Sequence, residues 1–217
     1  MQRLNEAYAV AAALGVTRMI VHNGWLPFIY FKSWQAEKGA AFWQEFLKDK
    51  ASNFHIYVEN VLEDEPYMLL DMMKQIDNPH IKLCLDTGHA NATTSPELPV
   101  EKWIEVLGPH IGHFHLHNND GTGDSHNAFD CGSMNMDSIF SAIDTFCDAD
   151  VTLTIEARDA RACLYWLEKN NYLCMFFALF CSFFMELVRL TVTMVIFFTK
   201  EVKKISTNYI IIKFTQL

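Results

Sequence analysis

"GHFHLHNNDGTGDSH", residues 112–126, places four histidines and two aspartates within fifteen positions. His113, His115 and His117 recur at every second position, and alternate residues of a β-strand point to the same face. A row of imidazoles fills a core poorly because each ring carries a polar nitrogen that needs a partner, whereas imidazole is the commonest metal ligand in proteins. One strand cannot complete a metal site. This stretch therefore predicts one strand of a sheet whose other strands supply further ligands.

Apolar strands and helical patterns alternate along the first 172 residues. We expect strands at 18–22, 54–60, 81–86, 111–117 and 151–157. We expect helices at 2–14, 35–50, 64–76, 100–107, 137–147 and 158–169. Strands that alternate with helices over short connections are typical of parallel β/α units. The pattern therefore predicts an α/β fold of the (β/α) TIM-barrel type.

The strand ends carry the residues that could perform chemistry. Four of the five strands end in or next to a metal-ligating side chain: His22, Glu59, Asp86 and Glu156. The fifth strand carries His115 and His117. In β/α barrels the catalytic groups lie where the strands end, and a mixed set of carboxylates and imidazoles suits Mn²⁺, Zn²⁺, Co²⁺ or Mg²⁺. The sequence therefore predicts one divalent-metal site on this face of the sheet.

Each residue alone also has an ordinary structural interpretation. The aspartate of "LDTGH" and His22 before Asn-Gly both suit tight turns. His113 lies deepest in its strand, which favours a core or supporting role, and His117 stays open between substrate contact and support. The joint occurrence on five strands favours the site. Three further histidines lie at element starts and receive no role: His55, His80 and His110. No cysteine occupies a ligand position, which argues against a structural zinc finger.

The net charge limits the classes of binding partner, and the cysteines indicate the cellular compartment. The chain has 26 acidic and 17 basic residues, and residues 173–217 hold only two acids against five bases, so residues 1–172 carry a net charge of -12. Such a body repels phosphate backbones unless bound metal offsets the charge, so nucleic acid is a disfavoured partner. Six cysteines without a C-x-x-C pair indicate the reduced thiols of a cytoplasmic protein.

Residues 173–217 differ in character from the preceding 172. The segment 173–198 is almost entirely apolar, and a bilayer span needs about 20 such residues, but Glu186 and Arg189 near its middle are costly in a membrane. Two interpretations stay open: a membrane anchor whose "KEVKK" flank faces the cytoplasm, or an unselected hydrophobic extension, which we favour. We therefore divide the chain into a barrel region, 1–172, and an extension, 173–217.

Five motifs, in this order along residues 1–172, resemble the xylose-isomerase-like TIM-barrel superfamily. They are "VHNG" (21–24), "VEN" (58–60), "CLDTGHAN" (84–91), "HFHLHNNDGTGDSH" (113–126) and "IEAR" (155–158). The superfamily includes sugar-phosphate isomerases and epimerases and endonuclease IV. Two differences from its pattern concern the substrate: Asn118 stands where Asp is frequent, and "FDCG" replaces "LGEG", keeping only Gly132.

The resemblance implies roles for particular residues. The metal-binding quartet of the epimerase branch corresponds to Glu59, Asp86, His115 and Glu156, with Glu59 and Glu156 also moving protons. Positions that hold additional zinc ions in endonuclease IV correspond to His22, His89, Asp124 and His126. In the epimerase branch, His89 would contact substrate oxygens instead.

The resemblance also implies the activity. We expect a divalent-metal-dependent isomerase or epimerase of a small sugar or sugar phosphate that transfers protons through carboxylates. The alternatives are an endonuclease IV-like phosphodiesterase acting on abasic DNA with more than one metal ion, and an inactive barrel. The superfamily places two β/α units before the helix at 2–14. We therefore expect an incomplete barrel, with open edges beside the strands at 18–22 and 151–157.

Overall fold

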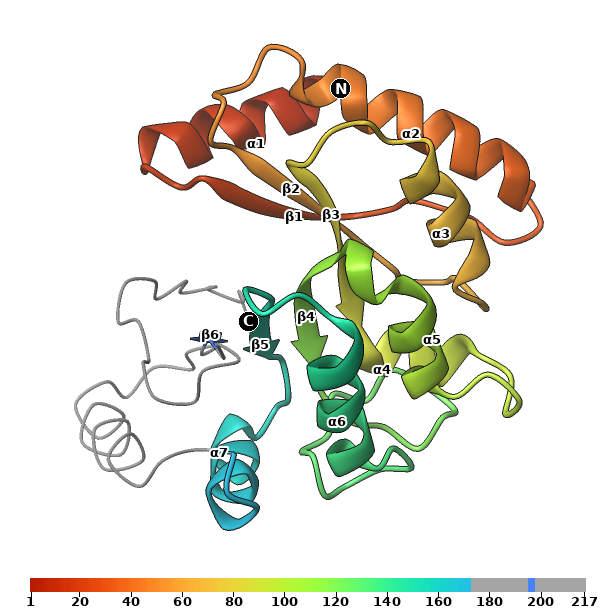
Figure 1. Cartoon of the computed structure of the whole chain (residues 1–217), viewed down its shortest axis with the longest axis vertical. Coiled ribbons are helices and arrows are strands. Elements are labelled where there is room, and N and C mark those ends of the chain that lie inside the picture. Colours follow the sequence, from red (N-terminus) through yellow and green to blue (C-terminus); the bar gives the residue numbers. More distant parts are fainter. Residues whose placement is uncertain (173–194, 198–217) are drawn as a thin grey trace.

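The computed structural model describes residues 1–172 and 195–197 of the chain (Figure 1). Its strands are β1 (Arg18–His22), β2 (His55–Glu59), β3 (Ile81–Asp86), β4 (Ile111–Leu116), β5 (Thr152–Ile155) and β6 (Val195–Phe197). Its helices are α1 (Gln2–Ala13), α2 (Lys32–Leu47), α3 (Tyr67–Lys74), α4 (Thr87–Thr93), α5 (Val100–Leu107), α6 (Met136–Phe146) and α7 (Ala160–Lys169), with a 3₁₀ turn, η1 (Gly108–His110), before β4.

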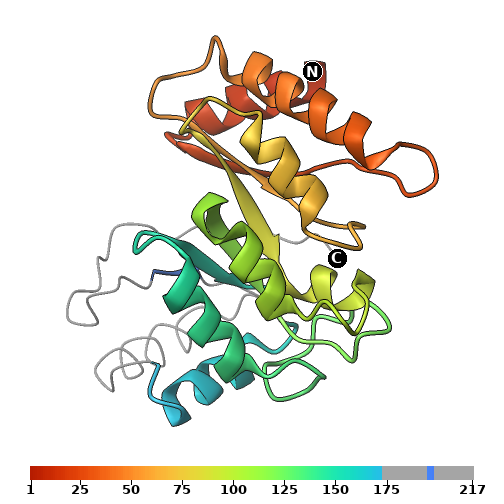
Figure 2. The same cartoon turned by 45° about the vertical axis from the view of Figure 1, so that its right-hand side comes forward.

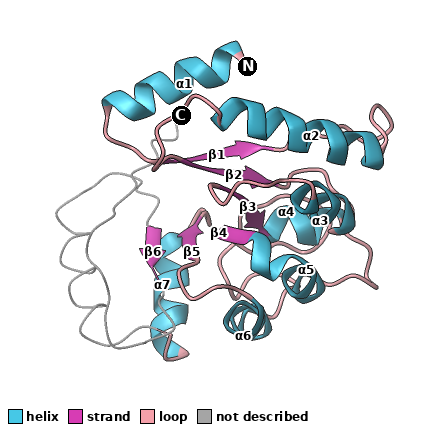
Figure 3. Cartoon of the chain, turned by 45° about the horizontal axis from the view of Figure 1, so that its top comes forward, coloured by secondary structure: helices cyan, strands magenta, loops and turns pink. Residues whose placement is uncertain are grey.

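The strands form one sheet in the order of the sequence. β1 to β5 are parallel, each paired with the next, and β6 pairs antiparallel with β5. The sheet curls, and helices α2, α3, α5 and α6 line its outer side (Figure 3). Neighbouring helices pack side by side, α2 against α3 and α5 against α6 (Figure 2). The predicted class is confirmed: the chain forms part of a (β/α) barrel.

Apolar strand residues on the side of the sheet that faces the helices form the core between sheet and helices. Ile56, Val58, Leu85 and Phe114 are each at most 1% exposed. They belong to a cluster that includes Trp103 of α5. Successive residues of a strand point to opposite faces of the sheet, so the apolar residues of these strands gather on the side that the helices cover.

The pairing of β3 with β4 contains one irregularity. Along β3 the register steps from Leu83 opposite Ile111 to the following residue opposite His113, so Gly112 is passed over. A side chain at Gly112 would place its Cβ only 2.6 Å from Cε1 of Tyr57 on β2. Glycine in a strand interior often marks such a bulge or a close approach. Here it is both.

This bulge decides which residue faces Asp86. Asp86 pairs with His115, whereas uninterrupted pairing from Leu83 would set Phe114 there. A shift of one residue exchanges the two faces of a strand. The bulge therefore turns the histidines of β4 toward the same face as Asp86.

The structure corrects three expectations. Residues 87–93 form helix α4. We did not predict this helix, since most residues of "TGHANAT" are weak helix formers. The helix expected at 64–76 spans only Tyr67–Lys74. The edge beyond β5 was expected to be open, but β6 pairs with it. At the other edge, no strand in the described ranges pairs with the outer side of β1.

The proposed membrane segment 173–198 lies outside the described residues except for β6. Within residues 1–172 and 195–197, no helix has the length and apolarity that crossing a bilayer requires. The division of the chain at residue 172 stays a prediction.

Candidate metal centre

The four residues of the predicted quartet converge on one imidazole nitrogen. Glu59 and Asp86 end β2 and β3, His115 lies in β4, and Glu156 follows β5. Nδ1 of His115 is 3.0 Å from Oε1 of Glu59. The same nitrogen is 3.5 Å from Oε2 of Glu156 and 3.8 Å from Oδ2 of Asp86. Four strands thus bring three carboxylates and one imidazole to a common point.

The charge of this group favours a bound cation. Glu59 is 4% exposed and Asp86 is fully buried, and buried carboxylates are costly unless they are neutralised. In the described part of the chain, the ion pairs of these two carboxylates are all with histidines. Burial lowers the pKa of His115, but its surrounding carboxylates, led by Glu59, outweigh burial and raise it. The donor set therefore fits a divalent ion such as Zn²⁺ or Mn²⁺.

Asp86 is held from several directions. Its side chain caps α4, accepting a hydrogen bond from the backbone N–H of His89 at 2.7 Å. Nε2 of His117 lies 3.1 Å from Oδ1. Burial raises the pKa of Asp86, but the hydrogen bond from His117 and the charges of His117, His89 and His115 lower it from 3.8 to about 2. Asp86 is thus an anion at neutral pH.

Two residues without a predicted role fix Asp86 and His117. The amide of Asn60 donates to the backbone carbonyl of Asp86 at 3.0 Å and accepts from its N–H at 2.8 Å. Gly88 lies against the ring of His117, where an added Cβ would sit 1.8 Å from Cε1. The signal for both was present in the motifs: a polar residue directly after a strand end, and a glycine beside a ligand.

The additional predicted residues form a second group around Asp124. Its carboxylate is 3.4 Å from Nε2 of His89, 3.0 Å from Nε2 of His126 and 3.5 Å from Nε2 of His117. The rings of His117 and His126 stack with centroids 3.9 Å apart. His22, more exposed, lies 3.7 Å from Glu59 through Nε2. All the predicted site residues therefore lie around one end of the sheet.

Asn118, which departs from the superfamily's usual residue, has a structural role. Its amide nitrogen donates to the backbone carbonyls of Phe129 and Met134 at 2.8 and 3.1 Å. A carboxylate could not donate these bonds. Gly132, retained from the family pattern, packs so closely that a Cβ there would lie 2.2 Å from Oδ1 of Asn118. Asn118 therefore holds the loop that follows His126 through these hydrogen bonds.

The chain belongs to the xylose isomerase-like TIM barrel family, whose sequence profile matches residues 1–170. The uncharacterized protein MJ1311 of Methanocaldococcus jannaschii is 32% identical over 101 residues, which are 46% of this chain and 34% of that protein. The chain thus matches about a third of the length of this curated relative.

Solved structures share the fold. A D-tagatose 3-epimerase-like protein has 23% identity and a TM-score of 0.57, covering 76% of this chain and 65% of that chain. An IolI protein with a binding zinc atom has 16% identity and a TM-score of 0.59, covering 75% and 61%. An L-ribulose 3-epimerase has 20% identity and a TM-score of 0.55, covering 79% and 58%. This chain spans less than two thirds of each of these proteins.

Proposed function

We propose that this chain carries the metal centre of a divalent-metal-dependent isomerase or epimerase of a sugar or sugar phosphate. The observation that carries the proposal is the convergence of Glu59, Asp86 and Glu156 on Nδ1 of His115. These four side chains would hold one divalent ion. Support comes from the structural neighbours, which include sugar 3-epimerases and a zinc-binding protein.

The reaction moves a proton at a carbon next to a carbonyl or hydroxyl. A bound divalent ion would polarise the carbonyl and stabilise the negative charge that develops when the proton leaves. Glu59 and Glu156 come from strands separated by β3 and β4 in the sheet, so they can approach a bound sugar from different sides. Each carboxylate would accept or return the proton, a role that typically contributes ~10²–10⁴-fold.

His89 would orient the sugar at the mouth of the site. Its Nδ1 lies 2.9 Å from the backbone carbonyl of Asn60, a geometry in which the ring N–H donates to that oxygen. This bond fixes the ring and leaves Nε2 as the nitrogen that faces Asp124. With its N–H engaged in this way, the neutral imidazole can accept a hydrogen bond through Nε2 and the carboxylate can accept others, so both can bind the hydroxyl groups of a polyol.

A second candidate function is favoured by the group around Asp124. His117, Asp124 and His126 each offer a ligand atom within 4.8 Å of the others, close enough to hold a further metal ion, as a phosphodiesterase of the endonuclease IV type would need. The net charge of -12 over residues 1–172 opposes binding to a phosphate backbone. We therefore favour the sugar enzyme.

Metal analysis and a substrate panel test the proposal. The full chain would be loaded with Mn²⁺, Zn²⁺, Co²⁺ or Mg²⁺, and its metal content measured by mass spectrometry. Each form would be assayed on ketoses, ketose phosphates and an abasic DNA duplex. We expect epimerisation or isomerisation that a chelator abolishes. Nicking of the duplex with every ketose unchanged would replace this proposal with the second candidate.

A further inference from the structure

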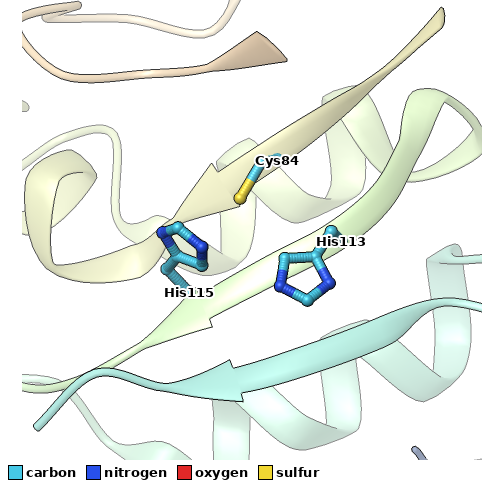
Figure 4. Close-up of side chains that lie close together, drawn as sticks. All are labelled: Cys84, His113 and His115. Carbon is cyan, nitrogen blue, oxygen red and sulfur yellow. The ribbon is translucent and has the colours of Figure 1, made fainter. Parts of the chain in front are cut away.

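A second cluster of potential metal ligands lies next to the carboxylate centre, nearer the start of strands β3 and β4. It consists of Cys84, His113 and His115 (Figure 4). Cys84 of β3 stands directly opposite His113 of β4 in the register, and His115 follows two residues later. One potential ligand atom from each lies within 4.8 Å of the others. All three residues are buried, at 1%, 3% and 2% exposure.

We propose that this cluster is a binding site for one thiophilic divalent ion of the Zn²⁺ or Cd²⁺ class. The ligands would be Sγ of Cys84, one ring nitrogen of His113, and Nε2 of His115. Nε2 is assigned because Nδ1 of His115 faces the carboxylates of the other centre. A thiolate with two imidazoles is a donor set that favours such ions over Mg²⁺.

The geometry requires movements of side chains alone. Zn–S and Zn–N bonds are about 2.3 and 2.0–2.1 Å long, so in a tetrahedral site a sulfur and a nitrogen lie about 3.6 Å apart. Atoms within 4.8 Å of one another reach such an arrangement through side-chain rotations that bring them closer by up to about 1.5 Å. The parallel pairing of β3 with β4 fixes the backbone on both sides.

Both ring nitrogens of His113 contact threonines of β5, so ion binding would displace one of these hydroxyls and keep the other. Nδ1 of His113 is 2.5 Å from Oγ1 of Thr152, and Nε2 is 2.8 Å from Oγ1 of Thr154. A hydroxyl can donate or accept. When one ring nitrogen binds the ion, the other can therefore keep its threonine as the partner that orients a metal-binding histidine. Binding would release the thiol proton of Cys84 to solvent.

The two centres would compete because they share His115. A neutral imidazole has one nitrogen lone pair for an ion, and its other nitrogen carries a proton. An ion on Nε2 therefore leaves Nδ1 as an N–H that donates to Glu59 and does not bind metal. This consequence, unlike the site itself, rests on the proposed function. A thiophilic ion in the cluster would then displace Mn²⁺ from the carboxylate centre.

Cobalt spectroscopy tests the site independently of any activity. The full chain would carry serine at the cysteines that could bind cobalt elsewhere: Cys131, Cys174 and Cys181. Because the carboxylate centre also suits Co²⁺ and shares His115, this chain would carry Glu59→Gln and Glu156→Gln as well. We expect one equivalent of Co²⁺ then to give a thiolate-to-cobalt charge-transfer band in the near ultraviolet. Cys84→Ser should abolish the band. Cys163→Ser, a change at a buried cysteine of α7, should leave it intact.

A band that persists in Cys84→Ser, or Co²⁺ binding without any band, would overturn the proposal. X-ray absorption of the cobalt-loaded parent protein decides the matter if Cys84→Ser does not fold. There we expect one sulfur at about 2.3 Å, and a shell of nitrogen and oxygen alone rules the site out. The carboxylate centre contains no sulfur, so failure of the ketose assay leaves the band unaffected and failure of the band leaves the ketose assay unaffected.

Discussion

The ring of His117 holds the carboxylate of Asp86 through one nitrogen that lies between its two oxygens. Nε2 of His117 is 3.1 Å from Oδ1 and 3.3 Å from Oδ2, and both residues are fully buried. Gly88 supports one side of the ring and His126 stacks on it. The sequence left His117 open between substrate contact and a supporting role. In this structure His117 orients Asp86.

Loss of His117 should weaken metal binding by releasing Asp86. The pKa of Asp86 is about 2 largely because of the bond and charge of His117. In His117→Ala that pKa should therefore rise, so protons compete with the metal at a higher pH. Partners of ligating groups typically contribute 10–100-fold to affinity, and we expect a loss of that order in calorimetric titrations at neutral pH.

His117→Gln is the informative companion, because its amide can still donate to Asp86, and it should recover part of the affinity. His110→Gln replaces a histidine outside the centre and should bind as the unmodified chain does. Equal affinity in His117→Ala and the unmodified chain would contradict the orienting role.

A methyl group at Gly88 should have the same effect by a steric route. An added Cβ would meet three atoms of the His117 ring within 2.5 Å, so the ring must move. Overpacking of this kind typically costs about 1–3 kcal/mol, and it also separates His117 from Asp86. Gly88→Ala should lower both the unfolding free energy in urea and the metal content.

Gly123→Ala is the matched control for that change. Gly123 is one residue from Asp124, yet nothing lies within 4 Å of its added Cβ, so both quantities should stay near those of the unmodified chain. If Gly88→Ala kept full stability and full metal content, the tight packing of Gly88 against the His117 ring would contribute to neither folding nor metal binding.

Substitution of a quartet carboxylate should reduce turnover and metal binding, whereas substitution of a histidine outside the quartet should not. Glu156→Gln and Glu59→Gln each remove a charge from the metal and a proton carrier from the reaction, so turnover should fall by ~10²–10⁴-fold and metal should bind more weakly. His55→Ala should change neither. Steady-state assays and metal analysis check both readouts. Full metal occupancy in a Glu59/Glu156 double alanine variant would refute the assignment of the quartet.

The sequence predicted the fold and the grouping of site residues because both follow from strand periodicity. Glu59, Asp86 and Glu156 each end or follow a strand, and parallel strands bring their ends to one edge. Periodicity alone would have failed for β4, however. The bulge at Gly112 exchanges its faces relative to β3, and the expected position of His115 was right because the register shifted. No spacing rule reveals that shift.

The position of Asn60 directly after a strand end was visible in the sequence, but contacts that depend on backbone geometry were not predictable in this way. Asn60 binds the backbone of Asp86, and Cys84 approaches two histidines, only because of the register between strands. Helix α4 also escaped prediction, since its start depends on the cap by Asp86, which offsets its weak intrinsic propensity.

The histidine pair at the opposite end of the strands should make stability depend on pH. Nε2 of His55 lies 3.4 Å from Nδ1 of His80. Burial first, and then the charges of His80, Arg18 and Lys82, lower the pKa of His55 below 6.5. The unfolded chain therefore takes up this proton at a higher pH than the folded chain does. The contribution of His55 to stability is full above pH 6.5 and is lost as the pH falls through that value toward the folded-state pKa.

Urea unfolding at about pH 7.5 and about pH 5.5 measures this dependence. On passing to the lower pH, the metal-free chain should lose more stability, or gain less, than His55→Gln does, because glutamine does not titrate. His115, whose pKa is raised, acts in the opposite direction in both proteins. His80→Gln should have part of the effect of His55→Gln, since the charge of His80 is only one of the causes that lower the pKa of His55. A difference that His55→Gln leaves unchanged would mean that other groups, such as His110 with its similarly lowered pKa, govern the acid response.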